Sequence, residues 1–180
     1  MFLDLVRTRQ SVRKYLPQAI EKEKLEQCLE AARLAPSASN GQPWRFIVIN
    51  EPGLLKELAE LTYGPLKSFN TFVNEDPVVI AIVLEKMKVV TRIGANLKDR
   101  EFALIDIGIT AEHLCLQAAE EGLGTCMLGW FDEDSIKQLL HIPAEKRIAL
   151  LITVGYCPKD YPIRQKQRKR IDQIVSYNNY

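Results

Sequence analysis

The chain has 180 residues, of which 47% are hydrophobic and 26% are charged, with 24 Lys and Arg against 23 Asp and Glu. This length favours one domain over residues 1–180, and the composition excludes disordered and collagen-like classes. The formal net charge of +1 hides an uneven distribution, because residues 7–14 carry four bases and no acid, and residues 159–170 carry six bases and one acid. Two cationic segments therefore flank an acidic remainder.

The periodicity of apolar residues predicts helices and strands in alternation along the chain. Pro36 ends the first helix, glycines at 122 and 124 end the third, and Asp132 is the expected N-cap of the fourth. The third helix is apolar on nearly every face, which predicts burial in the fold or in a subunit interface. The expected helices are 21–35, 54–61, 100–121 and 132–140, and the expected strands are 46–49, 78–84, 125–128 and 148–154. With further helices whose bounds the pattern does not give, these elements indicate an α+β domain with about four strands and five or more helices.

Two short motifs lie outside this pattern. Arg9, Ser11 and Arg13 alternate, so in an extended segment they share one side and can converge on an anion such as a phosphate monoester. A solvated basic edge is the competing interpretation. Residues 35–44, which read Ala-Pro-Ser-Ala-Ser-Asn-Gly-Gln-Pro-Trp, form a long loop whose small polar residues allow close approach to a planar polar ligand.

Several classes of chemistry lack their signatures. The four cysteines form no CxxC pair, HExxH is absent, and the two histidines lie far apart, so we expect no metal site. P-loop and GxSxG motifs are also missing, so any chemistry would be carried by a cofactor. The longest apolar run, residues 78–84, is far shorter than the roughly 18 residues of a membrane span, and Asp4 interrupts any signal-peptide core. We expect a reduced, cytoplasmic protein with no membrane partner.

The order of these motifs resembles the nitroreductase family of FMN-dependent oxidoreductases over essentially the whole chain. The matching features are Arg-x-Ser-x-Arg at 9–13, the run at 35–44, Gly-Leu-Gly-Thr at 122–125 with Leu128-Gly129 after it, and the basic C-terminal segment. The resemblance implies a central mixed β-sheet flanked by helices. It also implies an intertwined homodimer in which an arm at 158–180 packs on the partner subunit.

The resemblance implies two groups of FMN-binding residues. The phosphate would be held by Arg9, Gln10, Ser11 and Arg13, with Arg168, Lys169 and Arg170 as the candidates from the tail. The ring would be lined by Pro36, Ser37, Ala38, Ser39 and Asn40 of the other subunit, by Leu128 and Gly129, and by Asn70 as the nearest candidate for the pyrimidine edge. Trp130 and Phe131 would either shape the ring pocket or fill the core.

The implied reaction is ping-pong hydride transfer from NADH or NADPH to a nitroaromatic, quinone or similar small-molecule acceptor, with no catalytic side chain. Oxygen-dependent or dehalogenating reactions of the same family are the alternative. A module that binds anions or nucleic acid is a further alternative. However, Tyr161 is the only aromatic residue within the two basic segments, whereas interleaved stacking aromatics are typical of such modules. We therefore expect no nucleic-acid partner.

Overall fold

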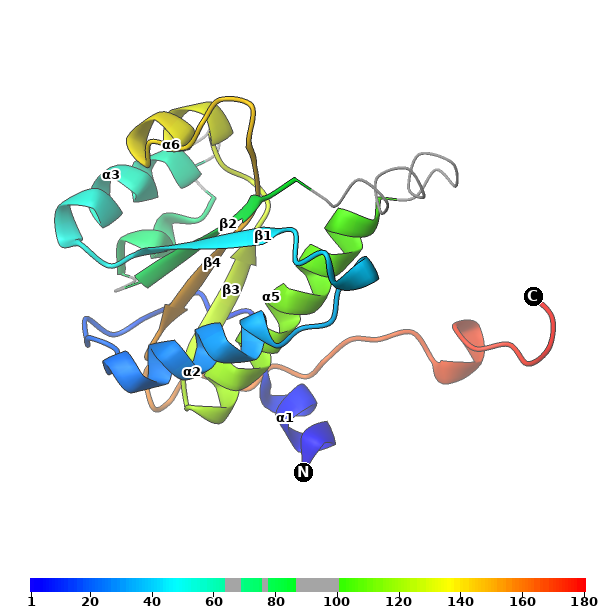
Figure 1. Cartoon of the computed structure of the whole chain (residues 1–180). Coiled ribbons are helices and arrows are strands. Elements are labelled where there is room, and N and C mark those ends of the chain that lie inside the picture. The colour runs from blue at the N-terminus through cyan, green and yellow to red at the C-terminus, as the bar shows by residue number, and fades with distance from the viewer. Residues whose placement is uncertain (64–68, 76–77, 87–100) are drawn as a thin grey trace.

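A four-stranded antiparallel sheet lies at the centre of the computed structural model, which describes residues 1–63, 69–75, 78–86 and 101–180. The strand order is β1-β2-β4-β3 (Figure 1). The strands are β1 (Trp44–Ile49), β2 (Val78–Leu84), β3 (Gly124–Leu128) and β4 (Arg147–Gly155). Their register pairs Ile49 with Val79, Val78 with Val154, and Thr125 with Val154. The β-branched run at 78–84 thus forms a strand, as predicted, and this strand lies inside the sheet.

Helices cover both faces of the sheet (Figure 1). On one face lie α2 (Lys22–Arg33) and α5 (Phe102–Glu120), and on the other lie α3 (Pro52–Thr62), α6 (Glu133–Leu139) and the 3-10 helix η2 (Thr71–Glu75). Successive residues of a strand point to opposite faces. Val79, Ala81 and Val83 therefore pack into one core and Ile80 and Ile82 into the other.

The caps confirm the local predictions. The carboxylate of Asp132 accepts a hydrogen bond from Ser135 N at 3.1 Å and begins α6. The carboxylate of Glu51 accepts from Gly53 N and Leu54 N and begins α3. Gly122, with a φ of +76°, follows the end of α5 in the left-handed conformation that glycine tolerates.

Two features differ from the sequence prediction. A short helix α1 (Phe2–Thr8), which is not among the predicted helices, precedes the first motif and has no buried residue. The four strands pair only antiparallel, and among the described residues parallel pairing is confined to one bridge between Ser11 and Thr125. In the single chain Ile105 of α5 is 54% exposed, so the burial of this side in a subunit interface stays a prediction.

Helix α5 is also long and apolar enough to cross a membrane by length and composition alone. Its contacts show that it packs inside the protein, because Ile107, Ala111, Leu114 and Ala118 lie in the apolar core between α2 and the sheet. In this structure α5 is therefore a core helix with one side exposed.

The C-terminal tail follows β4 and runs away from the helices and the sheet (Figure 1). Its first part passes residues 9–13, and its end contains a 3-10 turn, η3 (Ile171–Gln173). Large apolar side chains of the tail, including Ile163, Ile171 and Ile174, are exposed. The tail therefore contributes nothing to the core of its own chain.

Candidate functional site

The first motif lies against the free edge of β3. Ser11 forms the parallel bridge with Thr125, and Val12 N donates to Thr125 O at 2.8 Å. Val12 is buried while Arg13 is exposed, so the segment is extended and its residues alternate in direction, as predicted. Gly124 makes this approach possible, because a Cβ there would lie 2.7 Å from Val12 Cγ2.

The tail returns to the same segment through a set of hydrogen bonds. Gln10 Nε2 donates to Pro162 O at 2.9 Å, and Gln10 Oε1 accepts from Arg164 N at 3.0 Å. Tyr161 Oη accepts from Arg13 N at 3.0 Å. Gln10, which the resemblance placed among the cofactor-binding residues, thus ties the two ends of the chain together.

Two tail cations that the sequence interpretation left out of the site complete the contact. Lys166 Nζ donates to Arg9 O, and the guanidinium of Arg164 donates to Ser11 O. The spacing offered a signal for both, because residues 164, 166 and 168 alternate and share one side of an extended tail.

The electrostatics around Arg9 favour an anionic ligand. Arg9 Nε lies 3.1 Å from Glu112 Oε1, but without hydrogen-bond geometry, so this buried nitrogen has no hydrogen-bond acceptor within the described part of the chain. Partial burial, followed by the positive charges of Arg9 and Arg168, lowers the pKa of Lys166. Several positive charges gather here, and Glu112 is the carboxylate among the described residues that pairs with Arg9 and acts on Lys166. The donors therefore fit a phosphate group with several acceptor oxygens.

The three tail candidates differ in their surroundings. The charge of Arg168 helps to lower the pKa of Lys166, so Arg168 belongs to the cationic cluster with Arg9, Arg164 and Lys166. Arg170 instead pairs with Asp172 at 3.0 Å. Lys169 is exposed. Among the three, Arg168 is therefore the residue whose charge the structure brings to Arg9.

The second motif forms a tight loop, residues 37–42, which includes the 3-10 turn η1 (Ala38–Asn40). Ser39, Asn40 and Gln42 adopt φ values of 52°, 51° and 48°, which side chains other than glycine disfavour. Gln42 N donates to Ser37 Oγ at 3.0 Å, and Ala38 N donates to Asp106 of α5 at 3.1 Å. Pro36, Ser39 and Asn40 are exposed.

The two motifs contact different parts of α5. The 37–42 loop is bound at Asp106, whereas Arg9 pairs with Glu112, six residues and so roughly 9 Å further along the helix axis. No described contact joins residues 36–40 to residues 9–13 of the same chain. The structure of one chain does not assemble both groups into one site.

Leu128 and Gly129 end β3 at the opposite end from the Ser11 bridge. Leu128 is buried and Gly129 is exposed, with open space around its Cα. Asn70 Nδ2 donates to Thr62 O and to Trp130 O, each at 3.1 Å. Asn70, expected at the flavin edge, therefore ties the turn after β3 to the end of α3.

Trp130 and Phe131 of this turn differ in burial, so each fits a different one of the two expected roles, pocket or core. Phe131 packs against the core cluster on the α3 and α6 face, whereas Trp130 is 61% exposed. Only Trp130 is therefore available to shape a pocket.

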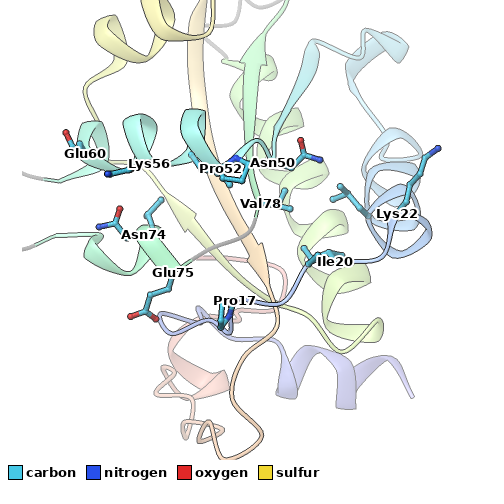
Figure 2. Close-up of a pocket in the computed structure, with 14 residues that line it drawn as sticks. Pro17, Ile20, Lys22, Asn50, Pro52, Lys56, Glu60, Asn74, Glu75 and Val78 are labelled. Atoms are coloured by element: carbon cyan, nitrogen blue, oxygen red, sulfur yellow. The ribbon is translucent and has the colours of Figure 1, made fainter.

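Two cavities lie near the end of the sheet where β2 and β3 begin. A small one, of about 140 Å³, is lined by Arg9, Gln10, Thr125 and Tyr161 among others, so it adjoins the cationic cluster. A larger one, of about 880 Å³, lies between the start of α2, α3 and η2 (Figure 2). Its walls include Ile20, Lys22, Asn50, Lys56, Asn74 and Glu75, and it contains none of the predicted cofactor residues.

Buried thiols do not offer a nucleophile. Burial raises the pKa of Cys28 to about 12 and that of Cys115 to about 11. Both stay protonated at neutral pH, and the thiolate is the reactive form. These two thiols are therefore excluded as nucleophiles, whereas the free thiol of Cys157 lines the small cavity beside Arg9.

Comparisons with known proteins agree with this geometry. The chain is 30% identical to the putative NAD(P)H nitroreductase YdgI of Bacillus subtilis, over 86% of this chain and 87% of that protein. It is 28% identical to the iodotyrosine deiodinase of Thermotoga neapolitana, over 100% and 99%. The structure of an FMN-dependent nitroreductase from Clostridium difficile superposes with a TM-score of 0.76 at 26% identity, covering 99% of each chain. A family model, "Nitroreductase family", matches residues 6–71 and 63–156. With most of its length covered by that model and a central sheet between two helical layers, the chain belongs to the nitroreductase family.

Proposed function

We propose that this chain is an FMN-dependent oxidoreductase that works as a homodimer in the cytoplasm and uses NAD(P)H to reduce nitroaromatic, quinone or similar electrophilic acceptors. The observation that carries the proposal is the cluster of Arg9, Arg164, Lys166 and Arg168, which come from the two ends of the chain. Arg9 pairs with Glu112, and the charges of Arg9, Arg164 and Arg168 act on Lys166. Such a cluster suits the phosphate of FMN, whose negative charge would offset the mutual repulsion of the bases.

The remaining parts of the proposed site support a dimer. The exposed residues of the 37–42 loop and the phosphate-binding segment are not in contact within one chain, so a second chain would supply the loop. Exposed apolar residues on α1, α5 and the tail, such as Phe2, Ile105 and Ile171, provide a surface for that contact. The cofactor would then lie between the two subunits.

In the proposed site the cofactor would carry the reaction, because no hydrogen bond joins a nucleophile to a base among its described residues. When bound, FMN would supply the redox chemistry, accepting a hydride from the nicotinamide and delivering two electrons to the acceptor. Arg9, Lys166 and Arg168 would anchor its phosphate, and backbone groups at Leu128–Gly129 and the 37–42 loop would orient its ring. The side chains of this protein therefore bind and orient rather than transfer protons.

The first test is the binding of FMN to purified protein. We expect a yellow preparation that releases FMN on denaturation and rebinds it from solution. Arg9→Ala and Arg168→Ala should each weaken FMN binding about tenfold or more, the value of a lost charge-assisted hydrogen bond. Lys86→Ala, which removes an exposed cation outside the cluster, should leave binding unchanged. Protein that does not take up FMN would refute the proposal, and equal behaviour of the three variants would refute the assigned site.

A second test identifies the acceptor. The likeness to an iodotyrosine deiodinase makes dehalogenation of halogenated phenols a second candidate reaction. We expect steady-state turnover with NADH or NADPH and a nitroaromatic or quinone to follow ping-pong kinetics. Turnover confined to halogenated substrates would favour the second candidate. Steep salt-dependent binding of DNA by flavin-free protein would favour a binding module instead.

A further inference from the structure

Helix α5 carries a polar stripe on the face that packs against the end of α2 and the 37–42 loop. Asp106, Thr110 and His113 are spaced four and three residues apart and therefore lie on one side of the helix. Each contacts backbone: both carboxylate oxygens of Asp106 lie 3.1–3.2 Å from Ala38 N, Thr110 Oγ1 donates to Ala32 O at 2.7 Å, and His113 Nδ1 lies 3.3 Å from Ala31 O. The stripe thus fixes α2 and the loop to α5.

Asp106 is the unusual member of the stripe. It is only 4% exposed, and burying a carboxylate carries a large desolvation cost unless hydrogen bonds offset it. Among the described residues its contacts are with one backbone N–H of the loop, that of Ala38, and not with a cation. A hydroxyl or an amide would satisfy the same N–H at a smaller desolvation cost, so these contacts do not by themselves account for a carboxylate at this position.

The conformation of the loop supplies a reason for such an anchor. Ser39, Asn40 and Gln42 all have positive φ, a conformation that costs free energy in residues other than glycine and persists only where the surroundings enforce it. Ala38, which Asp106 holds, directly precedes the first of these residues. Asp106 therefore acts at the point where the chain enters the strained turn.

We propose that Asp106 is a positioning residue, which holds the 37–42 loop in the conformation that lines the flavin ring of the partner subunit. This inference rests on the proposed function, which puts the loop against FMN. Asp106 itself would act through the backbone of Ala38, while Thr110 fixes the end of the preceding helix. The phosphate-binding cluster contacts α5 at Glu112, so its position would not depend on Asp106.

Three variants separate positioning from general stability. Asp106→Ala removes both acceptor oxygens, and Asp106→Asn keeps one acceptor oxygen for Ala38 N but removes the charge. Thr62→Val is the matched control, because Thr62 is fully buried in α3, on the other face of the sheet, and its hydroxyl donates to Ala59 O at 2.7 Å. Each variant is measured for its thermal midpoint without FMN, its dissociation constant for FMN, and the visible absorption band of the FMN-saturated protein.

We expect Asp106→Ala to raise the FMN dissociation constant tenfold or more and to change the flavin band. Asp106→Asn should raise the dissociation constant by a factor several-fold smaller and change the band less. Thr62→Val should lower the thermal midpoint and leave both flavin readouts unchanged. Arg9→Ala should weaken binding without changing the band at saturation. If Asp106→Ala does not fold, Asp106→Asn carries the test.

The outcomes separate this inference from the function on which it rests. Wild-type protein that binds no FMN would refute the proposed function itself. Wild-type protein that binds FMN, together with Asp106 variants that lose thermal stability but match Thr62→Val in both flavin readouts, would overturn only the positioning role.

Discussion

Lys166 is a residue whose own positive charge is disfavoured by its surroundings in the folded chain. Partial burial and the charges of Arg9 and Arg168 lower its pKa, so the folded protein disfavours the protonated amine. Between that lowered pKa and the ordinary value near 10.5, the unfolded chain binds more protons than the folded one. The free energy of unfolding should therefore rise with pH across this interval.

This reasoning gives a prediction for Lys166→Met, which keeps the aliphatic stem and removes the charge. In urea titrations of the flavin-free protein, wild type should gain stability relative to the variant as the pH rises from neutral toward 10.5. Added FMN should stabilise wild type more than the variant at neutral pH, because the charged amine then has an anionic partner. Parallel pH profiles for the two proteins would contradict the assigned electrostatics.

Single residues also show what the sequence could not reveal. The alternation at 9–13 predicted one side for Arg9, Ser11 and Arg13, but the bond from Ala38 to Asp106 joins residues 68 positions apart, and no local pattern encodes it. The amide nitrogen of Asn70 bridges Thr62 and Trp130, contacts that no local pattern encodes, while its expected contact with the flavin stays a prediction. Local spacing gives the direction of a side chain, whereas its partner depends on tertiary contacts.

At the level of elements, prediction worked where a strand or helix is defined by its own residues. Strand β2 coincides with the predicted run 78–84 because its β-branched residues are buried on both faces. Helix α6 begins at Asp132 because the side chain that predicts the cap also forms it. Helix α1 was not predicted, and none of its residues is buried. The course of the tail beside residues 9–13 depends on contacts about 150 residues apart in sequence.

The contact between β3 and the first motif yields a prediction for Gly124→Ala. The added Cβ would lie 2.7–2.9 Å from three atoms of Val12, so the extended segment must shift away from the sheet edge. We expect a loss of about 1–3 kcal/mol in the free energy of unfolding, as for other overpacked sites, and weaker FMN binding because Arg9 and Ser11 move with Val12.

The matched control is Gly129→Ala in the turn after the same strand, where the added Cβ meets no atom within 4 Å. Chemical denaturation of both variants should show a loss of stability for Gly124→Ala and little change for Gly129→Ala. Equal stability of the two variants would show that the segment at 9–13 can leave β3 without cost.

At the scale of the whole molecule, several large apolar side chains of the described chain are exposed to solvent instead of packing in the core. Phe2 and Leu3 on α1, Ile105 on α5 and Ile171 and Ile174 on the tail are each more than half exposed. Large exposed apolar side chains that form a contiguous patch are typical of an interaction surface. In the proposed homodimer, this surface would bring the 37–42 loop of one subunit to the phosphate cluster of the other.

A site built from two chains makes cofactor binding depend on protein concentration. Ile105→Asp places a charge on the exposed side of α5 and should convert the dimer to a monomer in sedimentation experiments. The variant should then bind FMN weakly, because each monomer retains only the phosphate half of the site. Gln138→Asp, which adds the same charge on the exposed side of α6, should remain dimeric and bind FMN as wild type does.

For wild type, FMN should dissociate on dilution in the same concentration range as the subunits. FMN binding that stays constant while the protein is monomeric would instead require a complete site within one chain, contrary to the separation of the two motifs along α5.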